Sequence, residues 1–223
     1  MENIKNIVLR NRFFLFGFAL FFLAGLLFLL ATSKETSFLY LNSYHNSALN
    51  IFFIAYTNLG DGLFTIMIVL FLLATKRHDI AWQLLAAFVI SGLVAQVFKY
   101  YVYSPRPKLF FSEREHIYLI DGITRSGNSS FPSGHTASIF ALVTVLALFA
   151  KNKIVCPVLL LPAILVAYSR IYLSQHFLGD VLAGSFIGVI VAVMVYYGFN
   201  FYAIKRRKPE VEFEAEPELV EIL

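Results

Sequence analysis

The stretch Ser169–Asp180, SRIYLSQHFLGD, gathers reactive side chains inside an otherwise apolar sequence. If His176 opens a helix, Asp180 follows four residues later on the same face, where its carboxylate can accept a hydrogen bond from the imidazole. Such a bond fixes one tautomer and leaves the other ring nitrogen as an oriented lone pair, able to act as nucleophile or base near neutral pH. Arg170 adds a permanent cation. The alternative is an Arg/Asp pair that anchors a helix end, with the histidine incidental, and this stretch alone leaves both open.

The composition around this stretch is that of a membrane protein. Of 223 residues, 59% are hydrophobic and only 14% charged, and the mean hydropathy is +0.73. The 24 Phe and 12 Tyr residues exceed what a water-soluble core of this size holds, whereas a bilayer accepts them. Cys156 is the only cysteine, which excludes an intrachain disulfide and a cysteine-based metal cluster. The net charge is +4, and six of the acidic residues lie at the end of the chain, so the remainder is distinctly basic, which suits anionic lipid head groups. The sequence shows no groove of basic and aromatic residues of the kind that binds nucleic acid.

Apolar segments long enough to predict membrane helices recur six times along the chain. The first could be a signal peptide, but it is long for a signal core and no small-x-small cleavage site follows, so we expect an uncleaved span. Near the start of the second, Asn58 and Asp61 suggest a polar rim. The six segments are residues 13–31, 51–74, 80–98, 136–150, 154–168 and 177–202. The sequence therefore predicts an all-α bundle of six transmembrane helices.

Basic residues predict the orientation of this bundle, because cytoplasmic loops of membrane proteins carry an excess of Lys and Arg. With the N-terminus inside, eleven basic residues face the cytoplasm: Lys5, Arg10, Arg12, Lys76, Arg77, Lys151, Lys153, Lys205, Arg206, Arg207 and Lys208. Seven face outward: Lys34, Lys99, Arg106, Lys108, Arg114, Arg125 and Arg170. We therefore expect both termini in the cytoplasm, with a membrane domain over residues 1–204. Residues 205–223 are expected to form a basic cluster and a disordered cytoplasmic tail with six glutamates.

The up-and-down threading brings three polar clusters to one membrane face. Lys99 ends the third predicted helix, His135 begins the fourth, and the fifth and sixth helices meet at Arg170 and His176. The first cluster, KYYVYSPRP over residues 99–107, is by itself typical of interfacial anchors. The second, FPSGHT over residues 131–136, opens a helix whose free backbone N–H groups and Ser133 hydroxyl can cradle an anion. An ordinary helix N-cap is the alternative for this second cluster.

Together the three clusters resemble the signature of the type 2 phosphatidic acid phosphatase (PAP2) superfamily, which also includes the vanadium haloperoxidases. The family pattern reads Lys-x6-Arg-Pro, then Pro-Ser-Gly-His, then Ser-Arg-x5-His-x3-Asp, and every position is matched here. The matching residues are Lys99, Arg106 and Pro107; Pro132 to His135; and Ser169, Arg170, His176 and Asp180. The six predicted spans fit the membrane branch of this superfamily.

The resemblance implies a role for each motif residue. His176 would attack phosphorus and become a phosphohistidine, Asp180 would orient it, and His135 would protonate the leaving oxygen. Charge on the transferring phosphoryl group would be stabilised by Lys99, Arg106, Ser133, the Gly134 amide and Arg170. Three fixed cations can take the electrostatic part of a metal ion, and the sequence has no Asp-x-Asp or His-Glu-x-x-His motif. We therefore expect metal-independent hydrolysis without a cofactor.

The sequence thus predicts a phosphatase of the cytoplasmic (inner) membrane that acts on a lipid phosphate or pyrophosphate at the outer face. Undecaprenyl pyrophosphate is the first candidate substrate, followed by phosphatidylglycerophosphate, phosphatidic acid and lipid A phosphates. Halide oxidation with bound vanadate is a second possibility, disfavoured by the six spans and the lack of a large soluble domain. A lipid-phosphate transporter or binding protein is a third, and it would not need both histidines and Asp180. The predicted partners are the lipid substrate and membrane lipids, nucleic acid is not expected, and the oligomeric state is left open.

Two groups of residues outside the motifs carry weaker expectations. Phe110 and Phe111 lie in the long interval 100–131, where they could guide a lipid chain or anchor the chain at the interface. His45, His78 and His116 match no motif and are expected at the surface.

Overall fold

The protein is described by a computed structural model that covers residue 6 and residues 9–112, 117–154 and 156–206. In this part of the chain the regular elements are all helical. They are α2 (Arg12–Ala31), α3 (Lys34–Leu41), α4 (Ser47–Tyr56), η1 (Thr57–Gly60), α5 (Gly62–Ala74), α6 (His78–Tyr101), α7 (Pro107–Phe110), α8 (Gly134–Phe149), η2 (Cys156–Leu159), α9 (Leu160–Tyr172) and α10 (Leu178–Arg206). Arg207, Lys208 and the six tail glutamates lie outside the described residues, as do Lys5, Arg114 and His116. The expected disorder of the tail therefore stays a prediction.

Each of the six predicted apolar segments is helical in the structure. Three helices, α2, α6 and α10, are long and apolar enough to cross a membrane. The second segment is broken: α4 with η1 and α5 together have the length of a span, but they meet at an angle of 54°. α8 has 16 residues and α9 has 13, which is short for a transmembrane helix. The described residues confirm an all-α chain with three helices, or four if the bent pair counts as one, that are long and apolar enough to span a membrane. Six crossings and the cytoplasmic termini stay predictions.

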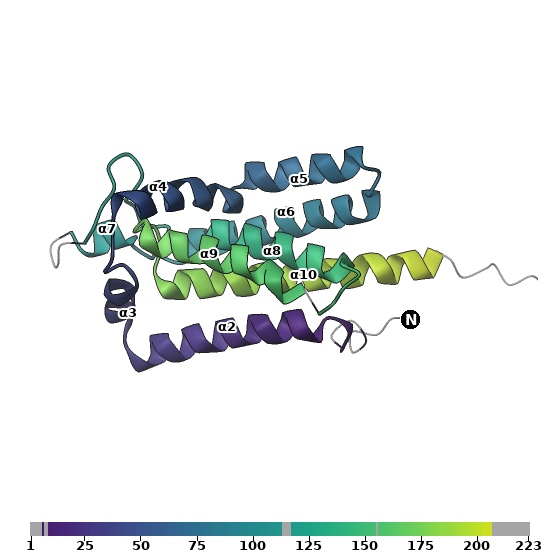
Figure 1. The fold of residues 1–223 in the computed structure, drawn as a ribbon, viewed down its shortest axis with the longest axis horizontal. Coiled ribbons are helices and arrows are strands. Elements are labelled where there is room, and N and C mark those ends of the chain that lie inside the picture. Colours follow the sequence, from purple (N-terminus) through teal and green to yellow (C-terminus); the bar gives the residue numbers. More distant parts are fainter. Residues whose placement is uncertain (1–5, 7–8, 113–116, 155, 207–223) are drawn as a thin grey trace, which may run out of the picture.

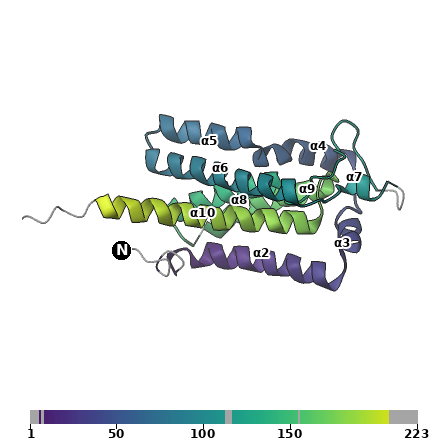
Figure 2. The same ribbon diagram turned by 180° about the vertical axis from the view of Figure 1, so that it is seen from behind.

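Helix α8 forms the centre of the bundle (Figures 1 and 2). Most of its side chains are buried, and it packs against α6, α9 and α10. Small residues permit the close approach of α10, because a Cβ at Gly184 would collide with the Ser133 carbonyl oxygen and one at Gly188 with that of Ala137. At the edge, α2 exposes Phe16, Leu20, Leu27 and Leu30, as expected for a helix that faces lipid. The buried core therefore centres on the helix that carries the second motif.

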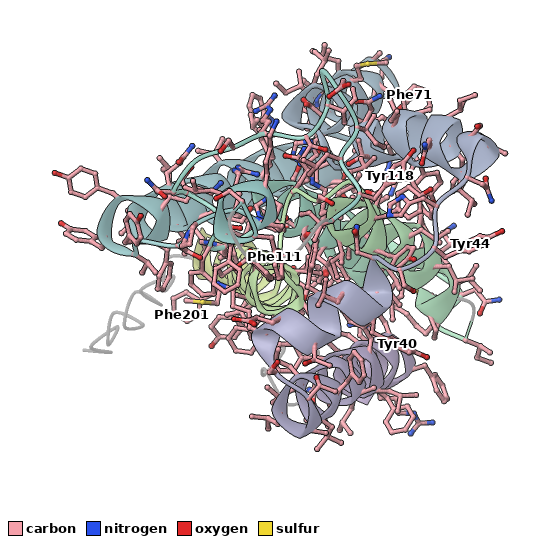
Figure 3. All side chains as sticks on the ribbon, turned by 90° about the vertical axis from the view of Figure 1, so that its left-hand side faces the viewer. Tyr40, Tyr44, Phe71, Phe111, Tyr118 and Phe201 are labelled. Carbon is pink, nitrogen blue, oxygen red and sulfur yellow. The ribbon has the colours of Figure 1, made fainter. Side chains whose placement is uncertain are left out.

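The functional motifs gather at one end of the bundle, which we call the site end. There α6 ends, α8 begins, α9 ends and α10 begins, beside α3 and α7, whereas α2 begins and α10 ends at the opposite end (Figure 1). Figure 3 views the molecule from the site end, with Tyr40, Tyr44 and Tyr118 among the labelled side chains. Tyr40 and Tyr44 are 71% and 67% exposed. Tyrosines at this position are typical of a membrane interface.

Two features of the site end differ from the expectation. The polar stretch after α2 contains a helix, α3, whose N-cap Ser33 accepts a hydrogen bond from the Thr36 amide. Phe111 neither guides lipid nor anchors the surface, because it is 3% exposed and stacks on Phe38 of α3 with ring centroids 5.4 Å apart. The two buried rings pack α3 against the segment that follows α6. The interval 100–131 is therefore packed on the bundle in part.

Candidate active site

Backbone hydrogen bonds join the three motif segments. The Ser133 amide donates to the Asp180 carbonyl at 2.9 Å, which fixes the start of α8 against the start of α10. The segment around Ser104 pairs with the segment that precedes the second motif, through the Ser130 amide and the Ser104 carbonyl at 2.9 Å. Next to it, the Arg106 amide donates to the Gly127 carbonyl, also at 2.9 Å. These bonds set the relative positions of the motif side chains.

His176 and Asp180 lie together at the start of α10, both buried. Nδ1 of the imidazole is 3.6 Å from Oδ2 of the carboxylate, which is too long for the direct hydrogen bond expected from the sequence. Oδ2 instead accepts hydrogen bonds from the Phe177 amide at 2.9 Å and from the Ser130 hydroxyl at 2.5 Å. The carboxylate is therefore fixed by two other donors, neither of which was predicted from the sequence.

Burial sets the protonation state of His176. Loss of solvent, with repulsion from Arg170 and Arg106, lowers its pKa to about 4, although the nearby carboxylate of Asp180 acts in the opposite direction. The imidazole is therefore neutral at pH 7. A neutral imidazole has one nitrogen with a free lone pair, as a nucleophile requires.

Three motif cations lie close enough to this pair to interact with it electrostatically. Arg170 is 7% exposed, and its Nη1 donates to the Thr57 hydroxyl at 2.7 Å. Arg106 donates through Nη1 to the backbone and side-chain oxygens of Gln175, at 3.0 and 3.2 Å. Burial, followed by repulsion from Arg125, lowers the pKa of Arg106. Lys99 is partly buried near the end of α6. Cations withdrawn from water and close to one another are stabilised by a bound anion, so the arrangement suits a phosphate group.

The second motif forms the N-terminus of α8. Ser133 is its N-cap, and its hydroxyl accepts from the Thr136 amide at 3.4 Å and the Thr136 hydroxyl at 2.8 Å. The N-cap interpretation is thus confirmed for Ser133. Its own hydroxyl hydrogen and the amide of Gly134, the first residue of α8, stay suited to an anion. Whether they bind phosphate remains a prediction.

A cavity of 250 Å³ opens beside the motif residues and contains His135 and Arg170 in its wall. The Nε2 atom of His135 lies 3.9 Å from Oδ2 of Asp61, which caps α5. Arg125 from the loop before the second motif also lines this cavity. Thr57, Asn58 and Asp61 reach it because the second span breaks there. The structure thus brings the predicted residues to one end of the bundle, with His135 and Arg170 exposed to a common space.

Several supporting residues were missed by sequence reasoning. Asn58 and Asp61 were noted as polar positions in an apolar segment, a signal that also applies to Thr57. Gln175 is adjacent to a motif histidine, whereas the roles of Ser130 and Arg125 have no signal in spacing or composition. Only the tertiary contacts of Ser130 and Arg125 reveal their place at the site.

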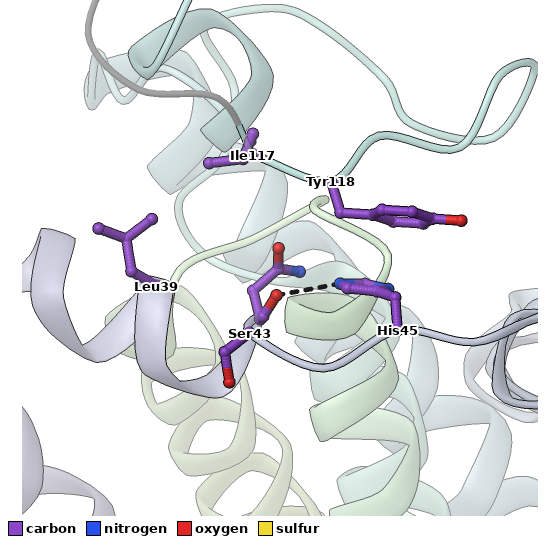
Figure 4. Close-up of a pocket in the computed structure, with 6 residues that line it drawn as sticks. Leu39, Ser43, His45, Ile117 and Tyr118 are labelled. Atoms are coloured by element: carbon purple, nitrogen blue, oxygen red, sulfur yellow. Dashed lines mark hydrogen bonds between the residues drawn. The ribbon is translucent and has the colours of Figure 1, made fainter.

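A second cavity of 550 Å³ lies behind the loop of the third motif (Figure 4). Its wall includes Asn42, whose amide donates to the carbonyls of Ile171 and Tyr172 at 2.9 Å each. His45 also lines it, and its ring lies against Tyr118 and Tyr172 with centroids 4.0 and 4.2 Å away. The expectation that His45 is a surface residue holds only in part: it is half-buried in an aromatic stack, and burial lowers its pKa. His78 is exposed as expected.

Comparison with known proteins identifies the family. The model of the PAP2 superfamily matches residues 80–203, more than half of the chain. Undecaprenyl-diphosphatase BcrC of Bacillus subtilis is 30% identical over 71% of this chain and 78% of its own length. Lipid phosphate phosphatase 1 of Arabidopsis thaliana is 32% identical over 63% of this chain, which spans about half (51%) of that relative.

Solved structures agree with this assignment. The crystal structure of Aquifex aeolicus LpxE matches with a TM-score of 0.64 and 29% identity, covering 72% of this chain and 92% of that one. A PAP2-type phosphatidylglycerolphosphate phosphatase from Bacillus subtilis shares the fold, with a TM-score of 0.63 at 24% identity over 83% of this chain and 94% of that one. By sequence motifs, family model and fold, the chain belongs to the PAP2 superfamily.

Proposed function

We propose that this protein is a membrane phosphatase that removes phosphate from a lipid phosphate or diphosphate at the outer face of the cytoplasmic membrane. The observation that carries the proposal is a neutral, buried His176 held beside Asp180, with Arg106 and Arg170 close to it, at the end of a membrane bundle. A site at the end of a membrane bundle suits a substrate whose chain lies in the bilayer and whose head group reaches water. The relatives are named as phosphatases of lipid phosphates and diphosphates.

In the proposed reaction, Nε2 of His176 forms a bond to phosphorus while the bond from phosphorus to the leaving oxygen breaks. His135 gives its proton to that oxygen. Charge on the phosphoryl oxygens is stabilised by Lys99, Arg106, Arg170, the Ser133 hydroxyl and the Gly134 amide. A water molecule then attacks phosphorus, His135 takes the water's proton, and the nitrogen–phosphorus electron pair returns to His176. The fixed cations supply the charge stabilisation, so turnover should continue in EDTA.

The first experiment measures phosphate release by the purified chain in detergent with EDTA present, on a panel of lipid phosphates and diphosphates. Wild type should turn over at least one lipid, and His176→Ala should lose this activity, since a nucleophile typically contributes several orders of magnitude. His78→Ala, an exposed histidine at the opposite end, is the matched control and should keep full activity. Binding of lipids without release in wild type would favour the transporter or binding-protein alternative, and strict dependence on a metal would contradict the mechanism.

A lipid diphosphate, with undecaprenyl diphosphate first, is the substrate that the cavity supports best. His135 marks the side on which the leaving group departs, and the cavity beyond it contains a fourth cation, Arg125. For a diphosphate, the leaving group carries the second phosphate to this side. Relatives from Bacillus subtilis and Sulfolobus acidocaldarius are named undecaprenyl-diphosphatases, although others are named lipid A 4'-phosphatases.

Comparing Arg125→Gln on matched substrates tests this choice. The loss of one charged contact should lower kcat/KM for the diphosphate about 10- to 100-fold while changing that for a monophosphate much less. Lys108→Gln removes an exposed charge at the same end and should leave both values unchanged. An equal loss on both substrates would place Arg125 on the transferred phosphate instead.

A further inference from the structure

Ser130 lies between the two central residues of the third motif. Its side chain is fully buried, and its Oγ is 2.5 Å from Asp180 Oδ2 and 3.4 Å from His176 Nδ1. The direct distance from that nitrogen to the carboxylate is 3.6 Å. The shortest hydrogen-bonded route from imidazole to carboxylate therefore passes through the serine hydroxyl.

The surrounding backbone holds Ser130 in this place. Its amide donates to the Ser104 carbonyl at 2.9 Å, within the pairing that joins the first and second motif segments. Three residues later, the Ser133 amide donates to the Asp180 carbonyl. Bonds on both sides of the short segment thus fix the hydroxyl relative to α10.

The chemistry of the three groups fixes the direction of their hydrogen bonds. An ionised carboxylate only accepts, so the Ser130 hydroxyl donates its single hydrogen to Asp180. Its oxygen can then only accept from His176, which requires the proton of the neutral imidazole to lie on Nδ1. The other nitrogen, Nε2, is left with its lone pair.

We propose that Ser130 is a positioning residue that completes a His176–Ser130–Asp180 relay and thereby fixes the nucleophilic tautomer of His176. This inference rests on the phosphatase function proposed above. When Nε2 forms its bond to phosphorus, the ring becomes positively charged and keeps its Nδ1 proton. The hydroxyl connects that charge to the carboxylate without any proton transfer, and the charge disappears when water displaces the ring from phosphorus. The low pKa of His176, due to burial, agrees with a neutral ring before the attack.

A double-mutant cycle on the 223-residue chain tests the relay. Ser130→Ala should lower kcat about 10- to 100-fold with KM nearly unchanged, because a hydrogen bond to a charged group is lost from the step that charges the ring. In an Asp180→Asn background the same change should have little further effect, since both residues act through one unit. Ser129→Ala, an exposed neighbour, is the matched control and should behave as wild type. Thermal unfolding of each variant verifies that it is folded.

Binding of orthovanadate, measured by calorimetry, provides a readout that needs no lipid. Vanadate adopts the five-coordinate geometry of a phosphoryl group in transfer, so Ser130→Ala should weaken its binding about 10-fold or more. Independent, multiplying effects of Ser130→Ala and Asp180→Asn, or a Ser130→Ala variant with wild-type kcat and vanadate affinity, would overturn the relay while leaving the phosphatase function intact. A wild-type chain that hydrolyses no lipid but binds vanadate in a Ser130-dependent way would overturn the function and support the relay. A wild-type chain that neither hydrolyses a lipid nor binds vanadate would overturn both the phosphatase function and the relay.

Discussion

His176 combines two properties that rarely coincide in a side chain, complete burial and a titratable group. In water a histidine has a pKa near 6.5, and here burial lowers it to about 4. Between these two values the unfolded chain binds a proton that the folded chain does not. Stability from the neutral ring is therefore fully present above about pH 6.5 and is lost as the pH falls toward 4.

This difference predicts a specific pH dependence of stability. Between pH 6.5 and pH 4, wild type should lose up to about 3 kcal/mol of unfolding free energy that His176→Ala does not lose. Thermal unfolding in detergent across this range measures the difference. Parallel loss in the two proteins would show that His176 titrates normally in the folded state.

The motif residues were predictable from the sequence because phosphoryl transfer requires particular side chains, and the spacing of these side chains in the chain matches the family pattern. Ser130, Gln175 and Thr57 were not predictable in the same way. Each acts by holding a motif side chain, and a hydroxyl or amide that serves as a holder can come from any nearby segment. The direct bond from His176 to Asp180 was expected from helical spacing alone, and it failed because the carboxylate is fixed by donors outside that helix.

At the level of elements, the break in the second span is what shapes the cavity. An apolar segment of this length predicts one continuous helix, but Asp61 caps a new helix and the 3-10 turn η1 precedes it. The turn packs closely against α8 and α9. A Cβ on Gly60 would lie 2.9 Å from the His135 carbonyl oxygen of α8 and 2.7 Å from Val166 Cγ1 of α9. Sequence pattern gave the segment but not its bend, because the bend depends on contact with α8 and α9.

Gly60→Ala should therefore move η1 away from α8. Overpacking of this kind costs about 1–3 kcal/mol of unfolding free energy, and kcat should fall as His135 shifts. Gly92→Ala is the control on α6, because a Cβ there meets no atom within 4 Å. Equal melting temperatures and equal activity for the two alanine variants would contradict this account of the bend.

At the scale of the whole molecule, the motif residues lie at one end of the bundle, and the proposed function requires this site end to face the outside of the cell. The only native cysteine, Cys156, is 2% exposed, so background labelling should be low. Tyr103→Cys at the site end should react with a membrane-impermeant maleimide in intact cells, whereas Lys76→Cys should react only after the cells are opened. Both positions are exposed on the protein. The reverse pattern would invert the orientation predicted from the basic residues.

Concentrating the motif residues at one end leaves the connection between α5 and α6 far from the chemistry. Lys76 in that connection is exposed and adopts a positive φ of 59°, a tight turn between two helices. Exposed turns of this kind are preferred positions for domain insertion. A rigid soluble domain inserted there would serve as a fiducial marker for electron cryomicroscopy of this 25.3 kDa chain. The fusion protein should keep its catalytic activity.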